Sequence, residues 1–420
     1  MEKALLVSVQ IKTDKHHWRI EDISSELEEL TLSAGARVIE NVISICQKPT
    51  ANYLIGKGKV EELSFIAHEE DIDTVIFSHD LSGTQQRNLE DAIGKKTVDR
   101  TQLILDIFSR RAKSPEGKMQ VELAQLQYLL PRLIGKGIIL SRIGGGIGTR
   151  GPGEQKLEID RRRIRKRIDK LKDDLKAFRS HRLVTHKRRK ENNLPSVVLV
   201  GYTSAGKSTL LNLLVGATQP VSEKLFTTLD PLSKSLQLPG GQNIILSDTV
   251  GFLHELPHHL IEAFKATLEE VREADLLVHV LDVHDPRLYQ HNQAVLSVLE
   301  ELGSADKPVI TALNKIDLLE DRSWFEVLKK EFGREAVLIS ARSGENLDAL
   351  IGGIERHFLG LMLNLKILIP HTRMELVDLF YRQAKVNKID YLQEGIRIDL
   401  SISRQLYSSL ASDKDIKIIN

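Results

Sequence analysis

The sequence predicts an α/β protein in which a domain with a mostly parallel sheet and helices on both faces is joined to three smaller parts. These are an N-terminal α/β domain, an antiparallel helical hairpin and a C-terminal α/β domain. Short apolar runs alternate with helical segments over residues 195–360, which is typical of a parallel sheet covered on both faces. Two segments before them carry apolar residues at coiled-coil spacing. A chain of 420 residues is also long for a single core.

The N-terminal α/β domain is expected over residues 1–115. β-like runs such as ALLVSVQ (4–10) alternate there with helical runs such as QQRNLEDAI (85–93). The turn YLIGKGKVEEL (53–63) places two glycines between a strand and a helix. Such a turn is either a phosphate-binding loop or, more often, simply tight, and the sequence leaves both interpretations open.

The helical hairpin is expected over residues 116–194, because apolar residues recur there along two segments with the spacing of helices that pack along one seam. They are Met119, Leu123, Leu126, Leu130 and Leu133 in the first segment and Leu157, Ile164, Ile168, Leu171, Leu175 and Phe178 in the second. The glycine-rich segment between them, about 137–153, cannot continue either helix. The helices are therefore expected to fold back on each other with this segment as a projecting tip.

The largest domain is expected over residues 195–360, from the apolar strands SVVLV, NIILSD, DLLVHVLDV, PVITALN and AVLIS with helices between them. Residues 361–420 are expected to add the small C-terminal α/β domain. They contain a strand (LKILIP), a helix (RMELVDLFYRQA) and two further strand-like runs (VNKIDY and GIRIDLSIS).

Composition points to a cytoplasmic protein that has no membrane association. With 41% hydrophobic and 28% charged residues the chain has the composition of a globular protein. No apolar stretch approaches the roughly 18 residues that cross a bilayer, and the N-terminus lacks the pattern of a signal peptide. The single cysteine, Cys46, cannot form an internal disulfide and suits a reducing compartment. A monomer is the default expectation.

Positive charge is concentrated in the second helix of the hairpin. Residues 161–190 hold 15 lysines and arginines and three aspartates, a charge of +12 in a chain whose net charge is +1. A charge run on a helix is usually a solvated face, but this run lacks compensating acids and adjoins the glycine-rich tip. Basic residues at this density neutralise nucleic-acid phosphates, so helix and tip are expected to bind RNA in a salt-dependent way.

The segment GYTSAGKS (201–208) fits the phosphate-binding pattern G-x-x-x-x-G-K-S and lies between a strand and a helix, as that loop requires. Backbone N–H groups of such a loop face the phosphates, Lys207 is expected to reach the β and γ oxygens, and Ser208 to ligate Mg²⁺. The residues expected to hold the nucleotide here are Gly201, Tyr202, Thr203, Ser204, Ala205, Gly206, Lys207, Ser208 and Thr209.

Two further motifs are expected to complete the phosphate and magnesium site. The run SDTVGF brings Asp248, expected to hold Mg²⁺ through water, and Gly251, whose N–H can contact the γ-phosphate. The run FTTLDP brings Thr228, expected to close over both the metal and the γ-phosphate. The predicted metal ligands are Ser208, Thr228 and Asp248, and the predicted catalytic groups are Lys207, Thr228 and Gly251.

The run NKID selects the base. Asp317 can accept hydrogen bonds from both N1–H and the exocyclic amino group of guanine, whereas adenine offers no such pair of donors. Asn314 and Lys315 precede it, and Ser340 and Ala341 in SARSG are expected to meet guanine O6. Each motif alone is weak, but their order and spacing together predict a P-loop GTPase domain that binds GTP or GDP with Mg²⁺.

Phe252 stands where many GTPases carry a glutamine that orients the attacking water. Phenylalanine cannot hydrogen-bond to water, so unassisted GTP hydrolysis is expected to be slow, on the order of 10⁻⁴ to 10⁻³ s⁻¹. An external partner is expected to complete the site.

Nearly the whole chain resembles the HflX family of translational GTPases. The GTPase motifs carry part of this resemblance, and the stretches YLIGKGKVEEL, VDRTQLILDIFSRRAKSPEGKMQVELAQLQYLLPRL and GGGIGTRGPGEQKLEIDRRRIRKRI carry it far more specifically. The resemblance implies a factor that binds the large (50S) ribosomal subunit, splits or rescues stalled or idle 70S ribosomes under stress, and hydrolyses GTP when the ribosome stimulates it.

The family's glycine-rich loop probes ribosomal RNA, which assigns RNA contacts to the tip and to the start of the basic helix. The residues concerned are Arg142, Gly144, Gly145, Gly146, Arg150, Arg161, Arg162, Arg163 and Arg165. One position departs from the family, because Ser204 stands where an asparagine is usual. That asparagine can hold a monovalent cation in related GTPases, so the resemblance leaves potassium dependence open.

Two other functions remain open. Some members of the family use ATP through the N-terminal region, so the chain could be an ATP-using enzyme that remodels ribosomal RNA, with the GKGK turn as its only local sign. Adenine-nucleotide affinity of residues 1–194 alone would test it. A GTP-gated scaffold for a protein partner is the other alternative, and binding that is insensitive to salt would favour it.

Overall fold

The computed structural model describes residues 1–13, 18–133, 152–191, 194–216, 225–226, 230, 232–254, 265–333, 335–360, 362–403, 407 and 416–419. It forms two compact units. The first unit comprises residues 1–179 together with 220–230 and 253–267, and the second comprises 180–219, 231–252 and 268–420. Within the described ranges, none of the helices combines the length and the apolar character that a bilayer crossing needs.

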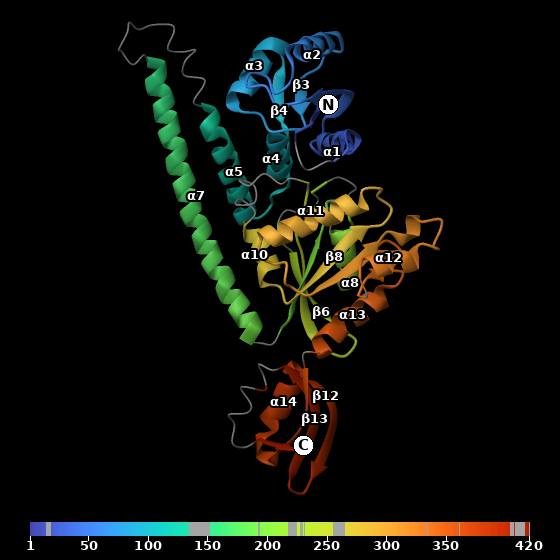
Figure 1. Cartoon of the computed structure of the whole chain (residues 1–420). Coiled ribbons are helices and arrows are strands. Elements are labelled where there is room, and N and C mark those ends of the chain that lie inside the picture. The colour runs from blue at the N-terminus through green and yellow to red at the C-terminus, as the bar shows by residue number, and fades with distance from the viewer. Residues whose placement is uncertain are drawn as a thin grey trace. The chain divides into compact units, whose positions relative to one another are not determined.

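The first unit contains a parallel four-stranded sheet in the order β2-β1-β3-β4 (Figure 1). Its elements are β1 (Lys3–Ile11), α1 (Ile20–Ser33), β2 (Arg37–Cys46), α2 (Lys57–Glu69), β3 (Thr74–Phe77), α3 (Gly83–Ile93), β4 (Lys96–Asp99) and α4 (Arg100–Arg111). Apolar side chains of β1 and β3 pack against α2 and α3 in one buried core. The predicted alternation of strands and helices in this part of the chain is confirmed.

Two long helices follow, α5 (Pro115–Arg132) and α7 (Pro152–Glu191), and the first unit includes α7 as far as Arg179. Leu123 of α5 packs with the buried Ile168 and Leu171 of α7, and most of the remaining seam residues surround them. An exposed ion pair joins Glu122 to Arg167 across the two helices at 2.6 Å. The predicted packing of the two seams is thus confirmed, except that Phe178 at the far end stays exposed.

The segment 196–360 forms a six-stranded sheet in the order β10-β9-β8-β5-β7-β6, in which only β6 is antiparallel to its neighbour among the described pairs. Its elements are β5 (Ser196–Gly201), α8 (Lys207–Val215), β6 (Leu232–Gln237), β7 (Asn243–Asp248), α10 (Lys265–Glu273), β8 (Leu276–Asp282), α11 (Leu288–Glu301), β9 (Val309–Asn314), the 3₁₀ turn η2 (Ile316–Leu318), α12 (Phe325–Glu331), β10 (Val337–Leu338) and α13 (Leu347–Gly360). The central strands are buried along their length, as a sheet with helices on both faces requires.

The last part of the chain forms an antiparallel sheet in the order β12-β13-β11-β14 with α14 beside it (Figure 1). Its elements are β11 (Met362–Ile369), η3 (His371–Arg373), α14 (Met374–Gln383), β12 (Lys385–Leu392), β13 (Gly395–Ser403) and β14 (Lys417–Ile419). Phe380 of α14 is fully buried against the isoleucines of β11 and β13. All predicted strands are present, and their antiparallel pairing is a finding that the strand pattern alone did not contain.

Candidate nucleotide site

The phosphate loop joins β5 to α8 and needs glycine at both ends. Gly201 has a φ of +156°, and a Cβ there would lie 2.3 Å from the carbonyl oxygen of Val280 on β8. Gly206 has a φ of +99°, and a Cβ there would lie 2.3 Å from Nδ2 of Asn314. Larger residues would therefore push the loop away from the sheet, which is the physical reason for the glycine spacing of the motif.

Lys207, the first residue of α8, points back into the loop. Its Nζ donates hydrogen bonds to the carbonyl oxygens of Gly201, at 3.0 Å, and Tyr202, at 2.7 Å. Burial lowers the pKa of Lys207 to about 8, although the nearby Asp248 carboxylate opposes that shift. A phosphate group bound here would supply the counter-charge that this buried ammonium needs.

Ser208 and Asp248 lie together, as a magnesium site requires. Ser208 Oγ donates to Asp248 Oδ2 at 2.5 Å, and the Asp248 side chain is buried at the end of β7. A hydroxyl and a carboxylate oxygen are hard donors of the kind that Mg²⁺ prefers alongside nucleotide phosphates, so the residues present fit this ion. Thr228, the third predicted ligand, lies outside the described residues.

The segment after β7 is joined to the phosphate loop through its backbone. The N–H of Thr203 donates to the carbonyl of Phe252 at 2.9 Å, and the N–H of Phe252 donates to the carbonyl of Gly201 at 3.1 Å. A Cβ on Gly251 would lie 2.8 Å from Cα of Thr203 and 3.1 Å from Nζ of Lys207. Only glycine lets the chain approach the phosphate loop this closely. The ring of Phe252 is apolar and cannot hydrogen-bond to an attacking water. It is also fully buried, so such a water could not reach it.

The guanine motifs converge through Asn314. Its Nδ2 donates to the carbonyl of Ala205 in the phosphate loop at 2.8 Å, and its Oδ1 accepts from the N–H of Ala341 at 2.8 Å. Asp317 is fixed from the same side, because its Oδ1 accepts from Ser340 Oγ at 2.6 Å. One buried asparagine thus ties together the three loops that were expected to surround the nucleotide.

The sequence analysis did not identify three residues that support this site, Asp282, Asp285 and His291. Lys315, at a φ of +69°, donates from Nζ to Asp282 Oδ2 at 2.6 Å. The ring of Tyr202 stacks on the imidazole of His291 in α11, with centroids 3.8 Å apart and an interplanar angle of 11°. His291 in turn lies 3.8 Å from the carboxylate of Asp285. Asp282 ends β8 and the other two follow it, and no motif marks them.

The predicted RNA-contacting residues fall into two groups. Arg162, Arg163 and Arg165 are exposed on α7, and Arg161 is half-buried there. The remaining predicted contacts, Arg142, Gly144, Gly145, Gly146 and Arg150, lie outside the described residues.

The space around the two glycines of the GKGK turn is open. Gly56 caps the N-terminus of α2 with a φ of −72°, and a Cβ at Gly56 or Gly58 would meet no atom within 4 Å. Steric contact therefore does not require glycine at either position, and the tight turn of this segment lies just before them, where the backbones of Thr50 and Leu54 exchange hydrogen bonds. The left-handed residue of this turn is instead Leu54, with a φ of +69°.

Comparison with known families covers most of the chain. Residues 21–109 match the family described as GTP-binding GTPase N-terminal, 111–189 GTP-binding GTPase Middle Region, 196–315 50S ribosome-binding GTPase, and 326–414 HflX C-terminal domain. The GTPase HflX of Caldanaerobacter subterraneus subsp. tengcongensis is 46% identical over 409 residues, which cover 97% of this chain and 93% of that protein.

The chain belongs to the HflX family of GTPases. The GTPase HflX of Escherichia coli is 38% identical over 401 residues, covering 96% of this chain and 93% of that protein. A crystal structure of SsGBP in complex with GDP is 28% identical, with a TM-score of 0.48, over 85% of this chain and 98% of that one. As an HflX GTPase with an assembled P-loop site, the chain binds guanine nucleotide and hydrolyses GTP.

Proposed function

We propose that this HflX GTPase binds the large (50S) ribosomal subunit through its ribosomal RNA, splits or rescues stalled or idle 70S ribosomes, and hydrolyses GTP fast only when the ribosome stimulates it. It acts as a cytoplasmic monomer on GTP with Mg²⁺, which Ser208, Thr228 and Asp248 hold. The observation that carries the proposal is the joining, in one chain, of a GTPase site with a buried phenylalanine and a long helix with exposed basic residues near its start.

The basic helix supplies the RNA-binding surface. α7 runs for 40 residues, and Arg162, Arg165 and Lys166 near its start all face solvent. Arg163 is exposed as well and lies 3.8 Å from Asp160, a separation at which solvent screens the pair. These side chains remain available to neutralise phosphates, and the counterions released on binding would make affinity fall steeply with salt.

The buried Phe252 explains why a ribosomal partner would be needed for fast hydrolysis. Lys207 and the Ser208–Asp248 pair are in place to bind the phosphates and the metal ion. Orientation of the attacking water needs a polar group, and Phe252 neither carries one nor reaches the surface. Ribosomal RNA or protein would complete the site, so hydrolysis would follow docking rather than precede it.

The described residues on either side of Thr228 belong to the first unit and contact its helices. Phe226 packs edge-on against Phe108 of α4, with ring centroids 4.5 Å apart, and the N–H of Leu225 donates to Ser33 Oγ of α1 at 2.9 Å. On the other side of Thr228, Asp230 accepts from the backbone N–H of Ser114, the N-cap of α5, at 2.9 Å.

The segment after Gly251 is held in the same unit. The imidazole of His254 stacks on Trp18 with centroids 4.2 Å apart, and its carbonyl accepts from Arg100. A nucleotide that reorders the segments around Thr228 and after Asp248 would therefore act on residues built into the unit that contains the hairpin. Fixing the hairpin in this way would present its tip to the large subunit.

GTP turnover with and without purified large ribosomal subunits, at several salt concentrations, tests the proposal. We expect a large stimulation that weakens as salt rises. Absence of stimulation at low salt would contradict the ribosomal role. Stimulation that ignores salt would favour a protein scaffold over an RNA-binding factor.

A further inference from the structure

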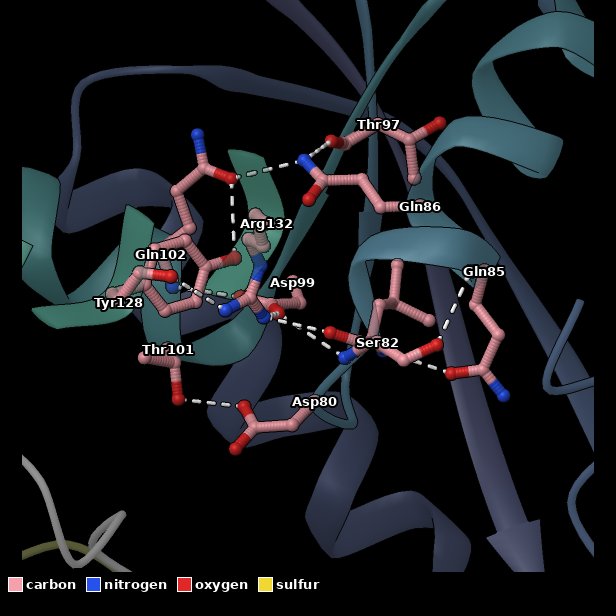
Figure 2. Close-up of polar contacts among 11 residues, drawn as sticks. Asp80, Ser82, Gln85, Gln86, Thr97, Asp99, Thr101, Gln102, Tyr128 and Arg132 are labelled. Atoms are coloured by element: carbon pink, nitrogen blue, oxygen red, sulfur yellow. Dashed lines mark hydrogen bonds and ion pairs between the residues drawn. The ribbon is translucent and has the colours of Figure 1, made fainter. Parts of the chain in front are cut away.

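A buried ion pair holds the last turn of α5 on the N-terminal sheet. Arg132 ends α5, and Asp99 ends β4 at the carboxyl edge of the parallel sheet. Figure 2 shows the two side chains meeting. Arg132 Nη2 lies 2.9 Å from Asp99 Oδ2. The contact joins residues 33 positions apart in the chain, so it is tertiary rather than local.

Asp99 is fully buried and surrounded by donors. Its Oδ1 accepts from the N–H of Gln102 at 2.8 Å, and its Oδ2 accepts from the N–H of Leu81 at 3.1 Å as well as from Arg132. A buried carboxylate is costly unless it is paired with a charge and hydrogen-bonded, and Arg132 supplies the charge. Removing the guanidinium would leave the carboxylate without its ionic partner.

Arg132 makes several further contacts. Its Nη2 also donates to the carbonyl of Leu81 at 2.7 Å, and its Nη1 donates to the carbonyl of Tyr128 at 3.0 Å. The guanidinium carbon lies 3.4 Å from the centroid of the buried Tyr128 ring, a cation–π contact. A Cβ on Gly83 would lie 3.1 Å from Cα of Arg132, so the helix backbone is seated directly against the start of α3.

We propose that Arg132 is a positioning residue for the RNA-contacting tip, because its contacts with Asp99, Leu81 and Tyr128 fix the end of α5 from which the chain continues into residues 134–151. The inference rests on the proposed ribosomal function. The hairpin's own cross-pair, Glu122 with Arg167, is bidentate, but its side chains are 40% and 45% exposed, so solvent screens it more strongly than the pair at Asp99. The anchor therefore sets where the tip begins, while the seam only keeps the two helices together.

Ribosome-stimulated GTP turnover of Arg132→Met, Arg132→Lys and the matched exposed control Arg167→Met tests the anchor. Intrinsic turnover, measured without ribosomes, reports on folding and on the nucleotide site. We expect it unchanged in all three variants. For Arg132→Met we expect the maximal stimulation by large subunits to fall at least tenfold, while the half-saturating subunit concentration stays within about threefold, because α7 still binds. Arg132→Lys, which keeps one charged donor, should recover part of the stimulation.

A double variant shows whether the effect passes through the tip. Deletion of residues 143–151 should remove the stimulation, and adding Arg132→Met to that deletion should change nothing further if both act on one element. The proposal would be overturned if Arg132→Met kept wild-type stimulation. It would also be overturned if the fold-losses of stimulation from Arg132→Met and from the deletion multiplied in the double variant. If both Arg132 variants lost intrinsic GTP turnover as well as the stimulated turnover, Arg132 would have only a structural role. A wild-type protein that large subunits do not stimulate would instead overturn the proposed function, and the anchor's role with it.

Discussion

The nucleotide site and the Arg132 anchor are both polar clusters at the carboxyl edge of a parallel sheet, yet only the first can be found by a motif. In the nucleotide site the loops approach their neighbours closely, so Gly201, Gly206 and Gly251 are required where a Cβ would clash. In the anchor, the central contact joins two side chains, and backbone N–H and carbonyl groups complete it. The comparison teaches that close backbone approach leaves a sequence pattern, whereas a buried ion pair does not.

The largest expected effect tests base selection. Asp317→Asn removes the carboxylate that is expected to accept two guanine donors, so GTP affinity should fall roughly 1,000-fold while affinity for xanthosine triphosphate rises. Equilibrium binding of both nucleotides measures this, with the exposed Asp321→Asn as a matched control. An unchanged base preference would contradict the assignment of Asp317.

A smaller effect tests the glycine requirement. Gly251→Ala places a Cβ 2.8 Å from the Thr203 backbone, so GTP turnover should fall roughly tenfold to a hundredfold through displacement of the loop. Steady-state turnover measures it. Gly58→Ala is the control, because a Cβ there meets nothing within 4 Å. Equal turnover in the two variants would show that the close approach at Gly251 has no bearing on function.

The buried lysine gives the nucleotide site a pH dependence that the exposed arginines of α7 lack. Because the pKa of Lys207 is lowered to about 8, its charge is present below that pH and lost above it. Bound phosphate favours the charged form, so GTP affinity should fall about tenfold per pH unit above pH 8. Titrations between pH 7 and 9 measure it, and Lys207→Arg, which stays charged, should show no such slope from this position. A flat wild-type profile would mean that Lys207 keeps an ordinary pKa.

The smallest expected effect is on thermal stability, and it compares the exposed ion pair of Arg167 with the buried ion pair of Arg132. Arg167→Met breaks an exposed pair, and the thermal unfolding midpoint should stay within about 2 °C of wild type. Arg132→Met leaves the buried Asp99 carboxylate without its ionic partner and should lower the unfolding midpoint by several degrees. Differential scanning calorimetry compares them, and equal shifts would show that burial does not distinguish the two pairs.

Much of the fold could be predicted, for reasons visible in particular segments. The parallel strands of the large sheet are largely apolar runs because both faces are covered, and the seam of α5 and α7 follows from the spacing of Leu123, Ile168 and Leu171. The antiparallel edge strand β6, LSKSLQ, has no such run and was not expected. The role of the glycines in the GKGK turn was beyond reach, because glycine spacing alone does not reveal whether a backbone needs glycine. The antiparallel pairing of β11 with β13 was also beyond reach, since strand direction depends on long-range pairing.

By itself, the sequence determined the phosphate loop, the guanine motifs and the basic helix, because each is a run of neighbours whose chemistry depends on local spacing. Only the tertiary structure decided that Asn314 joins three loops, that His291 stacks on Tyr202, and that Arg132 seats α5 on Asp99. These contacts join residues far apart in the chain, and their energy comes from burial, which no local pattern specifies.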